Sequence, residues 1–259
     1  MDGLTHPARL RVGIVGAGRV GAVLGAALRR AGHDVRAVYA VSRASRDRAA
    51  ELLPSIPITD LPDAIADQDL VLVAVPDEEL PTLVEGLALA GCWEAGQLVA
   101  HTSARHGAAV LDPVLSAHAL PLALHPAMTF TGTAMDLDRL ADCAFAVTAP
   151  APLRELAMAL VLDMGGQPVW VEEEHRADYH AALARVSERL AALVAEATAG
   201  LDRAGVHDPV AVFGPLARAV LDDELRRRPT SDPMGTLGGH PADLRGTWPR
   251  PDLPTEESS

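Results

Sequence analysis

The sequence contains no lysine and no asparagine, so its 22 basic residues are all arginines. Without lysine, the chain can form no Schiff base with a substrate and has no anchor for pyridoxal phosphate. Phosphate-binding loops that end in Gly-Lys-Ser or Gly-Lys-Thr are excluded, as are hydride-transfer sites built on a Tyr-x-x-x-Lys pair. Without asparagine there is no acceptor for N-linked glycosylation. Acid–base chemistry therefore falls to histidine, hydroxyl groups or carboxylates, and phosphate recognition falls to arginine and the backbone.

Positive charge is scarce overall, and the formal net charge of −13 disfavours binding to nucleic acids and anionic membranes. Cys92 and Cys143 lie far apart, so neither a disulfide framework nor a metal site is predicted. No apolar run approaches the ~20 residues of a membrane span, and residues 1–11 lack the apolar core of a signal peptide. We therefore expect a cytoplasmic protein that binds a small-molecule substrate.

Short apolar runs alternate with helical stretches through the first two thirds of the chain. The clearest run is 69–76, which is continuous, apolar and ended by proline. The predicted strands are 11–15, 35–41, 69–76, 97–101, 121–125, 144–148 and 168–171. Continuous apolar strands that alternate with helices indicate a sheet covered on both faces. The sequence predicts an α/β fold with a doubly wound, mostly parallel sheet.

The pattern changes after Val171. From Glu172 to Ala204, apolar residues recur every three or four positions, which predicts one long amphipathic helix, and a second follows at 210–227. From Pro229 onward the chain is rich in Pro, Gly, Ser and Asp. We expect a smaller all-helical domain at 172–228, for dimerisation or substrate binding, and an irregular tail at 229–259. A long apolar helix of this kind favours a homodimer.

A Gly-x-Gly-x-x-Gly pattern, residues 16–21, lies between the first predicted strand and the first helix. This context is typical of a Rossmann-type dinucleotide site, where the glycines permit a tight turn, close approach of the backbone to a pyrophosphate, and helix–strand packing. The helix N-terminus offers free N–H groups to the phosphates. We therefore interpret residues 1–171 as a dinucleotide-binding Rossmann domain; a glycine-rich turn without a ligand is the alternative.

The end of the second predicted strand indicates which dinucleotide binds. An NAD site usually places Asp or Glu there to bind the ribose 2′-hydroxyl, but residues 38–43 contain no acid. Ser42, Arg43, Ser45 and Arg46 could instead hold a 2′-phosphate, which favours NADP over NAD. A solvated helix start is the alternative. The residues predicted to bind the cofactor are Gly16, Ala17, Gly18, Arg19, Val20, Gly21, Ser42, Arg43, Val75 and Pro76.

Histidines and hydroxyls follow the next strands, where cofactor and substrate should meet. Histidine suits proton transfer coupled to hydride transfer because its ordinary pKa lies near neutral pH. His125 is the leading acid–base candidate, although a histidine that ends a strand can also simply fix a loop. The predicted catalytic residues are His125, His101, Ser103, Thr129 and His180. We interpret His33 as an ordinary surface or loop residue.

Several segments together resemble a bacterial family of Rossmann-like proteins with an uncharacterised helical C-terminal domain. These segments are Gly16-x-Gly18-x-x-Gly21, Val75-Pro76-Asp77, His101-Thr102-Ser103, His125-Pro126-x-x-Thr129-Phe130 and Asp178-Tyr179-His180-Ala181-Ala182. The family is similar to pyrroline-5-carboxylate reductase and the 6-phosphogluconate dehydrogenase group. The resemblance implies an NADP-dependent oxidoreductase with a dimerising helical domain that completes the cleft.

The chain departs from that family at three places: Ser103-Ala104 replaces Ser-Gly, Ser187-Glu188 replaces Ser-Asn, and the loop at 237–243 only partly matches. Our first hypothesis is hydride transfer between NADP(H) and a small carbonyl, imine or hydroxy-acid substrate. The departures motivate the alternative, a catalytically weak or inactive dinucleotide-binding sensor or scaffold. A third possibility is that the glycines bind nothing and the chain only assembles.

Overall fold

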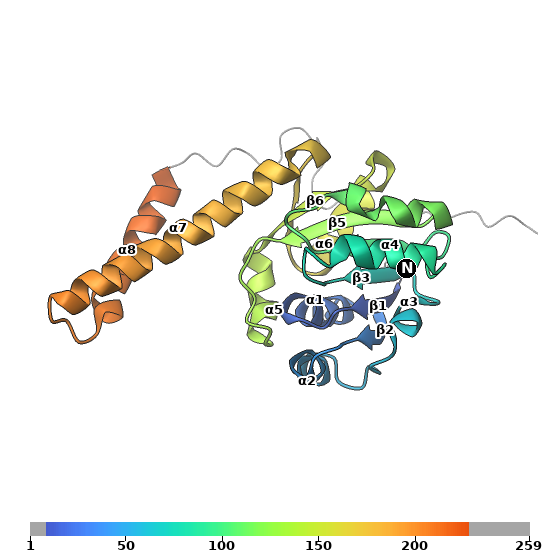
Figure 1. Cartoon of the computed structure of the whole chain (residues 1–259), viewed down its shortest axis with the longest axis horizontal. Helices are drawn as coiled ribbons and strands as arrows, with labels where there is room; N and C mark the ends of the chain where they lie inside the picture. The colour runs from blue at the N-terminus through green and yellow to red at the C-terminus, as the bar shows by residue number, and fades with distance from the viewer. Residues whose placement is uncertain (1–8, 228–259) are drawn as a thin grey trace, which may run out of the picture. The chain divides into compact units, whose positions relative to one another are not determined.

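The computed structural model describes residues 9–227. This part of the chain contains one seven-stranded sheet in the order β2-β1-β3-β4-β5-β6-β7 (Figure 1). The strands are β1 (Arg11–Val15), β2 (Asp34–Tyr39), β3 (Leu70–Val73), β4 (Leu98–His101), β5 (Leu120–Pro126), β6 (Ala144–Thr148) and β7 (Gln167–Trp170). The predicted doubly wound, mostly parallel sheet is confirmed, and the strands fall where the apolar runs predict them.

One strand pair breaks the parallel pattern. β5 and β6 are antiparallel, with Ala123 opposite Thr148, whereas all other neighbouring strands are parallel. Because β5 ends at the carboxyl edge of the parallel strands, an antiparallel β6 begins at that same edge. The connecting segment 127–143 therefore does not return across a face to the other edge. It stays where ligands bind in folds of this type.

Helices cover both faces of the sheet. The longer helices of this unit are α1 (Arg19–Arg30), α2 (Arg43–Leu52), α3 (Leu61–Ile65), α4 (Leu80–Leu89), the 3-10 helix η1 (Ala108–Ala117), α5 (Met135–Arg139) and α6 (Arg154–Asp163). One hydrophobic core joins one face to α1, α2 and α6, and a second joins the other face to α3, α4 and η1. Burial on both faces explains why Leu70–Val73 is apolar at every position.

Helix α1 shows how composition positions the loop that precedes it. Most of its residues are buried, and many are Ala or Gly, so its backbone packs close to the sheet. The helix ends before Gly32, which adopts a positive φ of 99° that suits glycine. Its N-terminus is thereby held at the carboxyl end of β1.

The chain divides into two compact units, and the second begins at Asp178. It is helical, as predicted: α7 (Arg176–Arg203) starts after a short turn at Glu173–His175, and α8 (Pro209–Arg227) follows. No helix within residues 9–227 is long and apolar enough to cross a membrane. The predicted tail at 229–259, including the loop at 237–243, lies outside the described residues.

Candidate functional site

The glycine-rich loop forms a tight turn between β1 and α1, next to the carboxyl ends of β2 and β3. Gly16 has a φ of 98°, and its amide donates to the carbonyl oxygen of Tyr39 at 2.9 Å. A Cβ at Gly16 would lie 2.5 Å from the carbonyl oxygen of Ala74 and 3.4 Å from Cγ1 of Val75. Since β2 and β3 lie on opposite sides of β1, this loop marks the reversal of strand order where dinucleotides bind.

The two later glycines of the loop have opposite surroundings. A Cβ at Gly21 would lie 1.9 Å from the carbonyl oxygen of Gly16, so glycine is needed for α1 to pack on the loop. A Cβ at Gly18 would meet no atom within 4 Å in the part of the chain that the structure describes. This open space lies at the start of α1, where the first amides have no partner within the helix. The loop therefore fits a pyrophosphate group, which needs both free amides and close access to the backbone.

The predicted phosphate-binding residues after β2 are engaged to different degrees. Ser42 caps α2: its Oγ accepts from the amide of Ser45 at 3.1 Å, and the Ser45 hydroxyl donates to the Ser42 carbonyl oxygen at 2.8 Å. Arg46 Nε donates to the carbonyl oxygen of Ala40 at 3.1 Å. The side chain of Arg43 is 96% exposed, with Asp47 3.9 Å away. The Arg43 guanidinium is thus almost fully accessible to a ligand.

His101 ends β4 and is completely buried. Its Nε2 lies 2.8 Å from the carbonyl oxygen of Gly107, and its Nδ1 accepts from the amide of Ser103 at 3.1 Å, which assigns the proton to Nε2. Burial is the main cause that lowers the pKa of His101 to about 3; the charges of Arg176 and His125 add to this, and the contact with Gly107 opposes it. His101 is therefore neutral at physiological pH, with both ring nitrogens engaged.

Protonation of His101 should make folding stability depend on pH. Because its pKa falls from 6.5 to about 3 in the folded protein, the unfolded chain binds the proton more readily. This contribution to stability is complete above pH 6.5 and is lost as the pH falls toward 3. We expect it to shrink by about 2 kcal/mol between roughly pH 7.5 and pH 5. Denaturant unfolding at both pH values should show this loss in the wild type and not in His101→Gln; equal pH dependence of the two proteins would contradict the prediction.

Ser103 acts within its own loop. Its Oγ accepts from the amides of Arg105 and His106, each at 3.1 Å. Downstream, Glu173 Oε2 accepts from the amide of Ala108 at 2.7 Å. These bonds fix the segment between β4 and η1, so the structure assigns Ser103 a local structural task beside its predicted catalytic one.

The segment after β5 carries the other candidates of the first unit. His125 is half-buried near the end of β5, and Thr129 is exposed, with its carbonyl oxygen accepting from Arg139 Nη1 at 3.0 Å. Asp136 is completely buried, and its Oδ2 accepts from the amides of Thr131 and Gly132, both at 2.8 Å. Burial would raise the pKa of Asp136, but these amides and Arg139 outweigh it and lower the pKa. His125 and Thr129 thus directly precede a segment that the buried Asp136 carboxylate holds in place.

The structure does not bring every candidate into one described site. Gly16–Gly21, Val75, Pro76, His101 and His125 lie at or next to the carboxyl ends of neighbouring strands of the first unit. His180 lies in α7, in the second unit, and is half-buried there. Its predicted catalytic role stays a prediction.

Sequence reasoning missed the buried arginine of the first unit. Arg176 is 2% exposed and donates to Thr148 Oγ1 at 2.7 Å and to the carbonyl oxygens of Ala123 and Ala146. A single arginine in a polar stretch carries no signal of burial. His33 lies in the loop between α1 and β2, in agreement with one of the two predicted placements, but it is not a surface residue: it is 4% exposed and lies 3.3 Å from Asp163.

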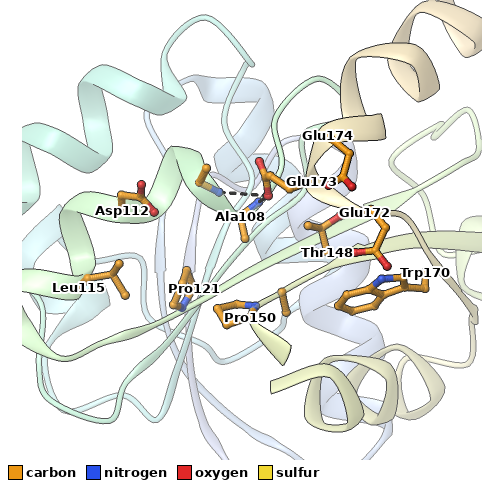
Figure 2. A pocket seen from close by; sticks show the side chains of 12 residues that line it. Ala108, Asp112, Leu115, Pro121, Thr148, Pro150, Trp170, Glu172, Glu173 and Glu174 are labelled. Carbon is orange, nitrogen blue, oxygen red and sulfur yellow. Dashed lines mark hydrogen bonds between the residues drawn. The ribbon is translucent and has the colours of Figure 1, made fainter. Parts of the chain in front are cut away.

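A separate pocket lies between η1 and the ends of β6 and β7 (Figure 2). It has a volume of about 270 Å³ and is lined by Trp170 and the carboxylates of Asp112, Glu172, Glu173 and Glu174, among others. None of the predicted cofactor or catalytic residues lines it. Within residues 9–227, no group of three or more His, Cys, Asp or Glu side chains is arranged to hold a metal ion.

Comparison with solved structures identifies the fold. The chain is similar to a candidate NADP oxidoreductase from Bacteroides fragilis, with 20% identity, a TM-score of 0.66, and coverage of 87% of this chain and 82% of that one. It is also similar to an imine reductase from Pseudomonas sp., with 17% identity, a TM-score of 0.64, and coverage of 84% of this chain and 75% of that one. A pyrroline-5-carboxylate reductase from Coxiella burnetii has 16% identity and a TM-score of 0.59, and the match covers 83% of this chain and 78% of that one. At these identities the likeness concerns the fold.

Family models cover most of the sequence. Residues 2–126 match a Rossmann-like domain, and residues 143–234 match a domain of unknown function, DUF2520. No curated protein sequence matches the chain. The second match includes the helical unit predicted to follow the sheet, and it also includes β6, α6 and β7 of the first unit. The chain contains a Rossmann-like domain followed by a DUF2520 domain.

Proposed function

We propose that the chain is an NADP-dependent oxidoreductase that transfers a hydride between NADP(H) and a small carbonyl, imine or hydroxy-acid substrate. The observation that carries this proposal is the glycine-rich loop at the reversal of strand order, with open space at Gly18 before the start of α1. The similarity of fold to an imine reductase and a pyrroline-5-carboxylate reductase supports it. The acidic net charge of −13 argues against partners that are nucleic acids or anionic membranes, and we propose a cytoplasmic setting.

The residues after β2 support NADP over NAD. No acid lies between Val38 and Arg43 to bind a ribose 2′-hydroxyl. The hydroxyls of Ser42 and Ser45 are committed to the helix cap, so the exposed Arg43 guanidinium is the group offered to a 2′-phosphate. Ser42 then contributes to the cofactor site indirectly, because as the N-cap it fixes where α2, which begins with Arg43, starts.

The candidate catalytic residues divide the remaining work. A bound nicotinamide dinucleotide would supply or accept the hydride. His125 would donate the proton to the oxygen or nitrogen of the reduced substrate, or remove it in the reverse direction. His101 is neutral and engaged on both ring nitrogens, so it is suited to position the loop that carries Ser103. Thr129, Ser103 and His180 would orient the substrate or stabilise developing negative charge.

Turnover with a panel of small carbonyl and imine compounds tests this function. The wild type should oxidise NADPH in the presence of at least one of them, and His125→Gln should lower kcat by about 100-fold or more without weakening NADP+ binding. His118→Gln is the matched control, because His118 precedes β5 and so lies at the opposite edge of the sheet. Its carbonyl oxygen accepts from the amide of Gly96 there. Absence of turnover across the panel, or equal kcat in both variants, would argue against the assignment.

A non-catalytic dinucleotide sensor or scaffold is the second candidate. The engagement of both His101 ring nitrogens and of the Ser103 hydroxyl favours it, because two predicted catalytic side chains already serve the fold. Glu188 points the same way, because the family that the sequence resembles tends to have asparagine there. Dinucleotide binding without turnover, together with a captured partner protein, would distinguish it from the enzyme.

We propose that the helical unit forms a homodimer. Large apolar side chains that are more than two-fifths exposed in the single chain are Val186, Leu190, Leu193, Val194, Val210, Val212, Leu216, Val220, Leu221 and Leu225. Burial of such a surface drives association. Light scattering should give twice the chain mass of 27.1 kDa for the wild type, and Leu193→Glu should shift it to the monomer, with Glu196→Gln as control. A monomeric wild type would contradict the proposal.

A further inference from the structure

Two arginines from different helices converge on Gly132, in the segment after β5. Gly132 has a φ of 81°, and a Cβ built on it would lie 2.9 Å from Nε of Arg48 and 3.1 Å from Cγ of Arg19. Arg19 is the first residue of α1, and Arg48 lies in α2. Three segments far apart in the sequence therefore meet beside the glycine-rich loop, and glycine leaves room for both arginine side chains.

The Gly132 backbone is held firmly at this point. Asp136 is completely buried, and its Oδ2 accepts from the amides of Thr131 and Gly132, both at 2.8 Å. Arg139 donates to the other carboxylate oxygen at 3.0 Å and to the carbonyl oxygen of Thr129 at 3.0 Å. The segment thus forms a fixed wall, and the two arginine side chains that pack on it have restricted positions.

The charge of this pair is not balanced by the protein. Within residues 9–227, neither Arg19 nor Arg48 has a carboxylate within ion-pair distance, although several other arginines of this acidic chain do. Arg48 is half-buried, and Arg19 is exposed. Both side chains are positively charged, and a bound anion would lower the repulsion between them. Guanidinium groups also match the oxygens of a phosphate, with several donors in a planar fork.

We propose that Arg19 and Arg48, positioned by the Gly132 segment, bind a phosphate group of the dinucleotide. This inference rests on the proposed function and extends the cofactor site to α2 beyond its cap and to the connection between β5 and β6. Arg19 directly follows Gly18, at the pyrophosphate end of the loop, and Arg48 comes from the helix that starts after β2, at the ribose end. The phosphate is therefore the pyrophosphate or the ribose 2′-phosphate, and both offer the same chemistry to the pair.

Calorimetric titration with NADP+, NAD+ and adenosine 2′,5′-bisphosphate tests the pair. Arg48→Gln and Arg19→Gln should each lower the affinity for NADP+ by about tenfold, the typical effect of losing one charge-assisted contact. A loss confined to NADP+ and adenosine 2′,5′-bisphosphate identifies the 2′-phosphate, and an equal loss for NAD+ identifies the pyrophosphate. Arg30→Gln is the matched control, because it removes the same charge from the exposed far end of α1 and should change each affinity less than about twofold.

The two proposals fail in different ways. If the wild type binds and turns over NADP(H) but both variants bind all probes as tightly as it does, the arginine pair is refuted while the oxidoreductase function stands. If the wild type binds the probes and the variants lose affinity but no substrate is turned over, the pair stands and the enzymatic function fails. A wild type that binds none of the three probes overturns both.

Discussion

A Gly18→Val variant is expected to lose about 100-fold or more in dinucleotide affinity while it keeps the thermal stability of the wild type. Gly18 has a φ of −66° and a ψ of −166°, which is close to extended backbone, so no positive φ requires glycine at this position. A Cβ at this position meets no atom of residues 9–227 within 4 Å, so we expect little disturbance of the folded state. The added methyl groups would occupy the space through which a pyrophosphate reaches the loop backbone, and 100-fold corresponds to about 2.7 kcal/mol. Calorimetry with NADP+ and thermal melting measure the two quantities.

Gly21→Ala is the contrasting variant in the same loop. Its Cβ would lie 1.9 Å from the carbonyl oxygen of Gly16, so α1 must shift away from the loop. We expect it to lower the free energy of unfolding by about 2 kcal/mol or more. The pair therefore separates ligand access from packing. Wild-type affinity in Gly18→Val would show that the dinucleotide does not approach this loop.

An Asp136→Ala variant is expected to lower the free energy of unfolding by about 3 kcal/mol or more. The carboxylate is completely buried and accepts from two backbone amides and from Arg139. Alanine would leave the amides of Thr131 and Gly132 without this acceptor, and a buried donor that loses its partner costs about 1–3 kcal/mol. Denaturant unfolding followed by circular dichroism measures the loss.

Asp138→Ala is the control in the same helix. Its side chain is 85% exposed and lies 3.6 Å from Arg30, so its removal should cost less than about 1 kcal/mol. Acid should reproduce part of the effect of Asp136→Ala. The pKa of Asp136 is lowered from 3.8 in the folded state, so its carboxylate stabilises the fold at neutral pH. This stabilisation is lost as the pH falls below 3.8. Equal stabilities of the two alanine variants would contradict the assigned role of Asp136.

Local patterns predicted the strands and helices well because burial on both faces leaves a local signature. β3 is apolar at every position, and α1 ends just before Gly32, a glycine that adopts the positive φ. The direction of β6 was beyond such reasoning, since an apolar strand has the same composition whichever way it runs. The length and path of the connection at 127–143 decide that direction, and they depend on contacts with other segments.

The candidate site divides in the same way. The glycine-rich loop is a motif of neighbouring residues, and its turn is found where the spacing predicts it. The state of His101 could not be predicted, because its neutrality follows from complete burial and from contacts with Gly107 and Ser103. The burial of Arg176 among strand carbonyls was equally hidden, since its acceptors lie 28 to 53 residues away along the chain.

The absence of lysine restricts proton transfer to histidine, hydroxyl groups and carboxylates, and restricts phosphate recognition to arginine and backbone amides. That restriction needs no structure, because a missing residue type is missing in every conformation. Which of the 22 basic residues can bind a phosphate depends on which of them lie close together in the folded chain. Arg19 and Arg48 are brought together by the packing of α1, α2 and the Gly132 segment. Composition determines which chemistry is possible, and long-range packing selects the residues that perform it.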